Sequence, residues 1–151
     1  PLLGREYPVR FEQRMKASFE QSVFYLPDSG EEAAKKALAD CYRSLAKAYL
    51  PDRAFSLARQ IGISPERVTV GGAKSRWGSC AEGKRIRLSW RLLLAPEEAV
   101  CYVIIHELCH CREMNHSKRF WSLVEEFCPG YQTAKELLLK TQRHPLFELL
   151  P

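Results

Sequence analysis

Patterns that would mark a membrane or secreted protein are missing from this chain of 151 residues. No apolar run approaches the roughly 18 residues that a membrane-spanning helix requires, so we expect no membrane partner. No segment has the charged, apolar and small-residue order of a secretory signal, and the expected location is therefore cytoplasmic. The chain begins with Pro1 rather than methionine, which predicts a preceding segment and an incomplete N-terminus.

Disulfide and zinc-ribbon patterns are also missing. The six cysteines include no CxxC pair and show no framework spacing, so we expect reduced thiols. Cys109 and Cys111 flank His110 and could in principle bind a metal. Residues two positions apart on a helix face different directions, however, and a small packed side chain is the more common role of cysteine. Gly71 and Gly72 lack the later glycine and lysine of a phosphate-binding loop.

The composition is that of one ordinary globular domain. Hydrophobic residues make up 46% and charged residues 27% of the chain, which disfavours disorder. A length of 151 residues suffices for a single domain, residues 1–151, with a substantial core. The net charge of +5 permits an anionic partner without requiring one.

The chemistry of the chain is concentrated between residues 106 and 116, which hold three of its four histidines. His106 and His110 lie four positions apart, so a helix places both rings on one face, where they can bind a single ion. Glu107 is carried beside them as a potential general base. Catalytic zinc usually takes three protein ligands and leaves one position for water, so this pair needs a third donor.

His116 is the predicted third ligand. On a continuous helix it would lie roughly 9 Å beyond His110, at about 1.5 Å per residue, and out of reach. The helix must therefore end between them, where Asn115 tolerates a left-handed conformation and Ser117 can cap the next helix. The alternative third ligand is a downstream glutamate: Glu125, Glu126 or Glu136. Those glutamates more simply form an exposed helix face.

The spacing equals that of the metzincin string HExxHxxGxxH, with two departures. Glu113 stands where that string has glycine. The only methionines are Met15 and Met114, so no methionine follows His116 to form a Met-turn below the metal. The chain thus shares the ligand spacing of metzincins without their other features.

Residues 74–93 are predicted to form a β-hairpin with its turn at 81–84. Ile86, Leu88 and Trp90 alternate with polar residues, as a strand with one buried face requires. A sheet edge beside a metal-binding helix can hold a peptide as an added strand, and we predict that this hairpin supplies that edge. The alternative is that Trp77 and Cys80 merely pack the core behind the site.

The same hairpin is strongly basic. Between residues 74 and 91 only Glu82 opposes six cations: Lys74, Arg76, Lys84, Arg85, Arg87 and Arg91. Because Trp77 and Trp90 are interleaved with them, the hairpin could contact phosphates and stack bases, which makes nucleic acid a second candidate partner. Edge strands also carry Lys and Arg simply to prevent sheet aggregation.

The remaining elements predict an α+β fold in which a small twisted antiparallel sheet packs with helices, including the helix of His106. Two short strands are expected over 2–11 and 18–26. The next helix is expected to end before Pro51, and a shorter one to run on to Gly62. Later helices are expected from Pro96, after Ser117 and over 133–142.

Several segments carry a family likeness: Ser-Arg-Trp-Gly-Ser-Cys at 75–80, Ile86 to Leu93, Pro96, Tyr102 to Leu108, and Asn115 to Trp121. Together they resemble the YgjP-like metallopeptidase family from about residue 74 to residue 139, with a fainter echo from Leu3 to Tyr7. The resemblance implies a zincin-like domain with His106, His110 and His116 as zinc ligands. It also implies that Glu107 is the catalytic glutamate. The chain is more distantly similar to SprT-like and WLM proteases, some of which act on proteins attached to DNA.

These observations predict a zinc-dependent metallopeptidase with one Zn²⁺ per chain and a peptide or protein substrate. Zinc would polarise the scissile carbonyl and lower the pKa of its bound water to about 7, while Glu107 acts as general base. Two other classes stay open, namely a non-catalytic zinc-binding module and a nucleic-acid-associated protein.

Overall fold

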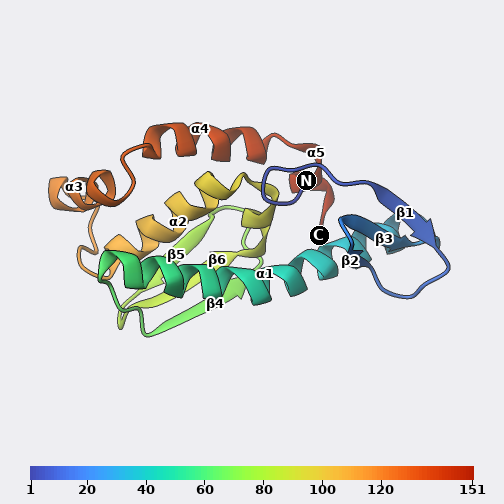
Figure 1. The fold of residues 1–151 in the computed structure, drawn as a ribbon, viewed down its shortest axis with the longest axis horizontal. Helices are drawn as coiled ribbons and strands as arrows, with labels where there is room; N and C mark the ends of the chain where they lie inside the picture. The colour runs from blue at the N-terminus through green and yellow to red at the C-terminus, as the bar shows by residue number, and fades with distance from the viewer.

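The computed structural model describes residues 1–151 and arranges two small sheets around a group of helices (Figure 1). In chain order the elements are β1 (Val9–Glu12), β2 (Ser18–Glu20), β3 (Val23–Pro27), α1 (Glu31–Ile61), β4 (Arg67–Gly71), β5 (Gly78–Ala81), β6 (Arg85–Ser89), the 3-10 helix η1 (Trp90–Leu94), α2 (Glu97–His110), α3 (Lys118–Phe127), α4 (Tyr131–Gln142) and α5 (Pro145–Leu149). No helix is both long and apolar enough to cross a bilayer.

Helix α1 runs unbroken through Pro51, so the predicted break at this residue is wrong. Ala46, Leu50 and Ala54 on either side of the proline are fully buried against the core. Their packing outweighs the cost of about 3 kcal/mol for a proline inside a helix. The helix ends as predicted at Gly62, whose φ of 69° is left-handed and whose N–H bonds the carbonyl of Ala58.

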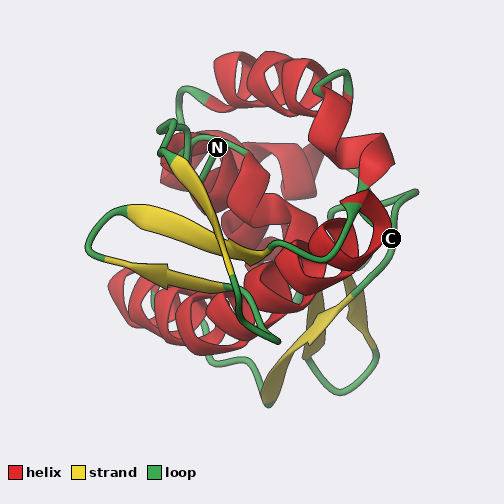
Figure 2. Ribbon diagram, turned by 90° about the vertical axis from the view of Figure 1, so that its right-hand side faces the viewer, coloured by secondary structure: helices red, strands yellow, loops and turns green.

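The N-terminal sheet has the strand order β1–β3–β2 and lies at one end of α1 (Figure 1). Its expected second strand is in fact two, because Gln21 and Ser22 have positive φ angles and turn the chain between β2 and β3. Phe24 of β3 is buried, and its ring lies 5.5 Å from that of Tyr42 in α1. Figure 2 shows the two sheets in separate parts of the molecule.

The second sheet has the order β4–β6–β5 and packs against α2, the helix that carries His106 and His110. The α+β class is confirmed, but the sheets are mixed rather than antiparallel, because β4 pairs in parallel with β6 and β1 with β3. Alternation along β6 is as predicted, with Ile86 and Leu88 buried and Arg85 and Arg87 exposed. The strand pairing ends at Ser89, after which the chain forms η1 instead of continuing the hairpin.

Helix α2 lies at the centre of the molecule, between α1 and α4 (Figure 1), and it packs on β5 and α3 as well. Ala99, Val100, Ile104 and Leu108 are fully buried, so α2 is a central apolar helix. Burial on several sides holds α2 rigidly, so the side chains on its last turns have defined positions.

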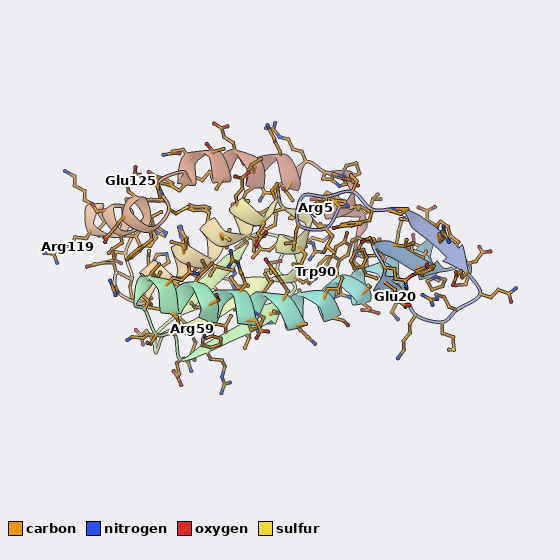
Figure 3. All side chains as sticks on the ribbon, in the orientation of Figure 1. Arg5, Glu20, Arg59, Trp90, Arg119 and Glu125 are labelled. Atoms are coloured by element: carbon orange, nitrogen blue, oxygen red, sulfur yellow. The ribbon has the colours of Figure 1, made fainter.

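The C-terminal tail packs on the core through Phe147 and Leu150, both of which are buried. Arg91 is only 1% exposed and donates hydrogen bonds to the carbonyls of Gly72 and Leu150. Its guanidinium also lies 4.3 Å from the ring centroid of Trp90, which Figure 3 labels in the interior of the molecule. Arg91 is therefore a structural residue rather than part of a basic surface.

Candidate active site

The last two turns of α2 bring His106 and His110 together on one face, with ring centroids 5.0 Å apart. The chain then turns back and places His116 against both of them. Nε2 of His116 lies 3.2 Å from Nε2 of His110 and 3.3 Å from Nε2 of His106. One ligand atom from each histidine lies within 4.8 Å of the other two, so a single ion can contact all three.

The return of His116 follows in part from local sequence, although Asn115 does not adopt the left-handed conformation considered for it. Helix α2 ends at His110, and the backbone N–H groups of Cys111 and Arg112 bond to carbonyls near the helix end. As predicted, Ser117 caps α3, and its hydroxyl accepts a hydrogen bond from the N–H of Phe120 at 3.3 Å. His116 directly precedes this cap, so the start of α3 determines its position.

The outer nitrogens of two histidines have hydrogen-bond partners. Nδ1 of His110 lies 3.0 Å from the carbonyl oxygen of Glu113, and Nδ1 of His106 lies 3.3 Å from the hydroxyl of Tyr102. A carbonyl only accepts, so Nδ1 of His110 carries the proton and its Nε2 presents a lone pair. At residue 113 the contact is made by the backbone, so glutamate can stand where the metzincin string has glycine.

The environment favours the neutral form of His106 and His110. Burial, together with the adjacent His110 and His116, lowers the pKa of His106 to about 4. Burial likewise lowers the pKa of His110, whose ring stacks on Phe120 at 4.3 Å between centroids. The three Nε2 atoms converge, and a metal cation can accept a lone pair from all three at once.

Glu107 lies on the neighbouring face of α2 and is only 6% exposed. Burial, with a smaller contribution from the nearby Cys111 and an opposing one from Arg76, raises its pKa to about 7. Gly78 of β5 packs directly against this side chain, since a Cβ at Gly78 would lie 3.0 Å from both Cγ and Oε1 of Glu107. The contact of Gly78 with Glu107 could not be predicted from sequence, because nothing in the local pattern around Gly78 points to its distant neighbour.

A cleft of about 620 Å³ opens beside His106 and Glu107, between the start of β5 and α4. Its lining is Arg76, Trp77, Gly78, Tyr102, Val103, His106, Glu107, Gln132, Lys135, Glu136, Leu138, Leu139 and Gln142. Trp77 faces this cleft and also makes an edge contact with Phe147, with ring centroids 5.3 Å apart. Trp77 therefore both lines the cleft and packs on the C-terminal segment, and the binding of a substrate strand along the hairpin stays a prediction.

An aromatic wall, formed by Tyr102, Tyr131 and Trp121, adjoins the histidines. Tyr131 stacks on Tyr102 at 6.1 Å and on Trp121 at 5.5 Å, and Lys135 lies 4.6 Å from the centroid of Trp121. Sequence reasoning missed this wall. The position of Tyr102, one turn before His106, was the available indication.

The alternative ligands are not part of the histidine group, which consists of His106, His110 and His116 alone. Glu125 lies on α3, at the end of the molecule that also carries Arg119 (Figure 3). Glu136 lines the cleft without joining the group. Cys109 is buried, and Cys111 instead has its sulfur 3.9 Å from that of Cys80.

Three converging imidazoles beside a buried carboxylate, at a sheet edge and open to a cleft, are the arrangement of a metal-dependent hydrolase. The comparisons with known proteins agree with this class. A model of the YgjP-like metallopeptidase domain matches residues 1–141, and the chain belongs to that family. It is therefore a metallopeptidase, and its family implies a bound metal ion.

Two solved structures of metallopeptidase zymogens are similar to this chain. The zymogen of Pyrococcus abyssi abylysin shares 26% identity with a TM-score of 0.52, over 62% of this chain and 92% of that one. The zymogen of Methanocaldococcus jannaschii jannalysin shares the fold at 21% identity and a TM-score of 0.51, over 62% of this chain and 94% of that one. No curated protein matches the chain.

Proposed function

We propose that this protein hydrolyses peptide bonds with one zinc ion held by His106, His110 and His116. The observation that carries the proposal is the convergence of three Nε2 atoms beside the buried carboxylate of Glu107. Three imidazole ligands with a fourth position left for water are a common set for catalytic zinc. The partners of Nδ1 on His106 and His110 support this assignment, because they direct Nε2 of both rings toward the ion.

Glu107 is the proposed general base. Zinc, when bound, polarises the scissile carbonyl and lowers the pKa of a bound water to about 7. The raised pKa of Glu107, also about 7, matches the carboxylate to accepting a proton at neutral pH and passing it to the leaving amine. Close packing of Gly78 and burial within α2 hold the carboxylate in place and exclude water from one side of it.

The proposed substrate is a peptide in extended conformation. Strand β5 pairs only with β6, so its other edge is free to bond a substrate backbone. The cleft beside that edge combines apolar side chains of Val103, Leu138 and Leu139 with the polar rim of Arg76 and Lys135. A side chain of the substrate would enter this cleft while the backbone follows β5.

Metal analysis of purified protein tests this function. Wild type should hold about one zinc per chain, and His116→Ala should lose most of it. His144→Ala is the matched control, because this histidine caps α5 outside the cluster and its loss should leave the zinc in place. Unchanged zinc in His116→Ala would overturn the assignment of the third ligand.

Glu107→Gln separates an enzyme from a non-catalytic zinc module. The enzyme should keep zinc and lose peptide cleavage, because Glu107 is not a ligand in the proposed site. Cleavage of a peptide library at the wild-type rate by Glu107→Gln would refute the proposed base.

A nucleic-acid-associated role is the second candidate, and one surface favours it. Arg67, Arg85 and Arg87 share the exposed face of the β4–β6–β5 sheet, where paired residues of β4 and β6 align. If this face binds phosphates, the affinity of the protein for DNA should fall steeply as the salt concentration rises. The variant in which Arg67, Arg85 and Arg87 are all replaced by alanine should not bind DNA. Absence of binding even at low salt would exclude this role.

A further inference from the structure

Two cysteines from distant parts of the chain meet beside the active site. Cys80 lies on β5 and Cys111 directly follows α2, and their sulfurs are 3.9 Å apart. Both side chains are half-buried, so small molecules can reach them. The half-buried thiol of Cys101 differs, because its sulfur accepts a hydrogen bond from Arg53.

The two cysteines belong to a regular contact between β5 and α2. Gly78 and Cys80 are two residues apart and face the same side of β5, whereas Glu107 and Cys111 are four apart and share a face of the helix end. Gly78 packs on Glu107, and Cys80 packs on Cys111. The contact of Cys80 with Cys111 therefore lies directly beside the contact of Gly78 with Glu107, the proposed general base.

We propose that Cys80 and Cys111 form a redox-active dithiol that closes to a disulfide and clamps β5 against α2. The sulfurs must approach from 3.9 Å to about 2.05 Å, the length of a disulfide bond. Most of this distance can come from rotation of the two side chains. The remainder draws β5 toward the helix.

The oxidant is a small-molecule disulfide such as oxidised glutathione. One protein thiol loses its proton, attacks a sulfur of the small disulfide and releases one small thiolate, which forms a mixed disulfide. The second protein thiol, also deprotonated, attacks the protein sulfur of that bond and releases the second small thiolate. The two released thiolates take up the two protons, so two protein thiols are oxidised and one small disulfide is reduced to two thiols.

Closure should also alter the proposed peptidase, and this part rests on the function proposed above. A single added methyl group on Gly78 would already lie 3.0 Å from the Glu107 carboxylate. Drawing Cys80 inward presses the same strand onto Glu107. We expect oxidation to reduce the rate of peptide cleavage at least about tenfold, because small displacements of catalytic groups lower the rate sharply.

Mass spectrometry tests the disulfide without reference to activity. Full-length protein is equilibrated in mixtures of reduced and oxidised glutathione, alkylated and digested. The expected product is one cross-linked peptide pair containing Cys80 and Cys111, which a dithiol reductant reverses. Cys80→Ser and Cys111→Ser should accumulate glutathione on the remaining thiol instead, and Cys101→Ser should behave as wild type.

Two results would overturn the proposal: a mixed disulfide on either cysteine of wild type that never proceeds to the cross-link, or oxidation that links other cysteines first. Peptide cleavage is then compared before and after oxidation, with Cys80→Ser expected to be insensitive. If no cleavage is detected in any form, the mass measurement still decides whether the disulfide exists.

Discussion

The hydroxyl of Tyr102 lies 3.3 Å from Nδ1 of His106, one helical turn further along α2. This contact joins the aromatic wall of Tyr102, Tyr131 and Trp121 to the proposed metal site. It fixes the orientation of the His106 ring, because the hydroxyl can accept the Nδ1 proton while Nε2 faces the other histidines. Tyr102 is therefore a positioning residue for a proposed ligand.

Tyr102→Phe should weaken zinc binding about 10- to 100-fold, the usual cost of losing a partner of a ligating histidine. The fold should be retained, since the ring still stacks on Tyr131. Competition with a zinc chelator measures the affinity. Tyr131→Phe is the matched control, and equal affinities in the two variants would show that the hydroxyl of Tyr102 has no such role.

Gly78→Ala should reduce peptide cleavage far more than it reduces stability. The added methyl lies 3.0 Å from Glu107 and 3.2 Å from Leu88, so the carboxylate must move. Zinc content should stay at the wild-type level because no histidine is contacted. Gly72→Ala is the control, since the methyl group added there would lie at an ordinary contact distance of 3.6 Å from its nearest neighbour, Trp90. Normal steady-state kinetics in Gly78→Ala would count against the placement of Glu107.

Ser117→Ala should lower the free energy of unfolding by about 1 kcal/mol through loss of the cap on α3. Because His116 directly precedes this cap, zinc affinity should fall as well. Urea unfolding and chelator competition measure the two effects. Ser122→Ala, at an exposed position of the same helix, should change neither, and a purely stability-related loss in Ser117→Ala would separate the cap from the metal site.

Pro51→Ala should stabilise the protein by about 1–3 kcal/mol. Proline lacks the N–H that would bond to the carbonyl one turn earlier in α1, and alanine restores this donor without disturbing the continuous helix. Chemical unfolding at neutral pH gives the value. A loss of stability would mean that packing of the proline ring stabilises the protein more than the restored hydrogen bond does.

The metal-free protein should lose stability as the pH falls from 6.5 toward about 4. The pKa of His106 is lowered from 6.5 to about 4 in the folded state, so the unfolded chain binds more protons in this range. The raised pKa of Glu107 acts in the opposite direction, and the measurement is therefore made in Glu107→Gln. Thermal unfolding with a chelator present should show this slope, and His106→Asn should flatten it. A stability that does not change over this pH range in Glu107→Gln would refute the lowered pKa of His106.

The helices around the site could be predicted from sequence because their causes are local. The spacing of His106 and His110 places both on one helix face, and Ser117 supplies its own cap to the next helix. The alternation of Ile86 and Leu88 likewise sets the buried face of β6. These features depend on residues only a few positions apart, so the sequence alone was sufficient for them.

Tertiary packing decided the rest. Helix α1 passes through Pro51 because distant core residues bury Leu50. Strand β4 pairs in parallel with β6 because β5, which lies between them in the chain, runs in the opposite direction along the other side of β6. The contacts of Gly78 with Glu107 and of Cys80 with Cys111 join segments about thirty residues apart. No local pattern encodes such neighbours, since they exist only once the sheet edge has packed against the helix. The sequence by itself thus determined the histidine motif and its local turns, and the fold determined which residues surround it.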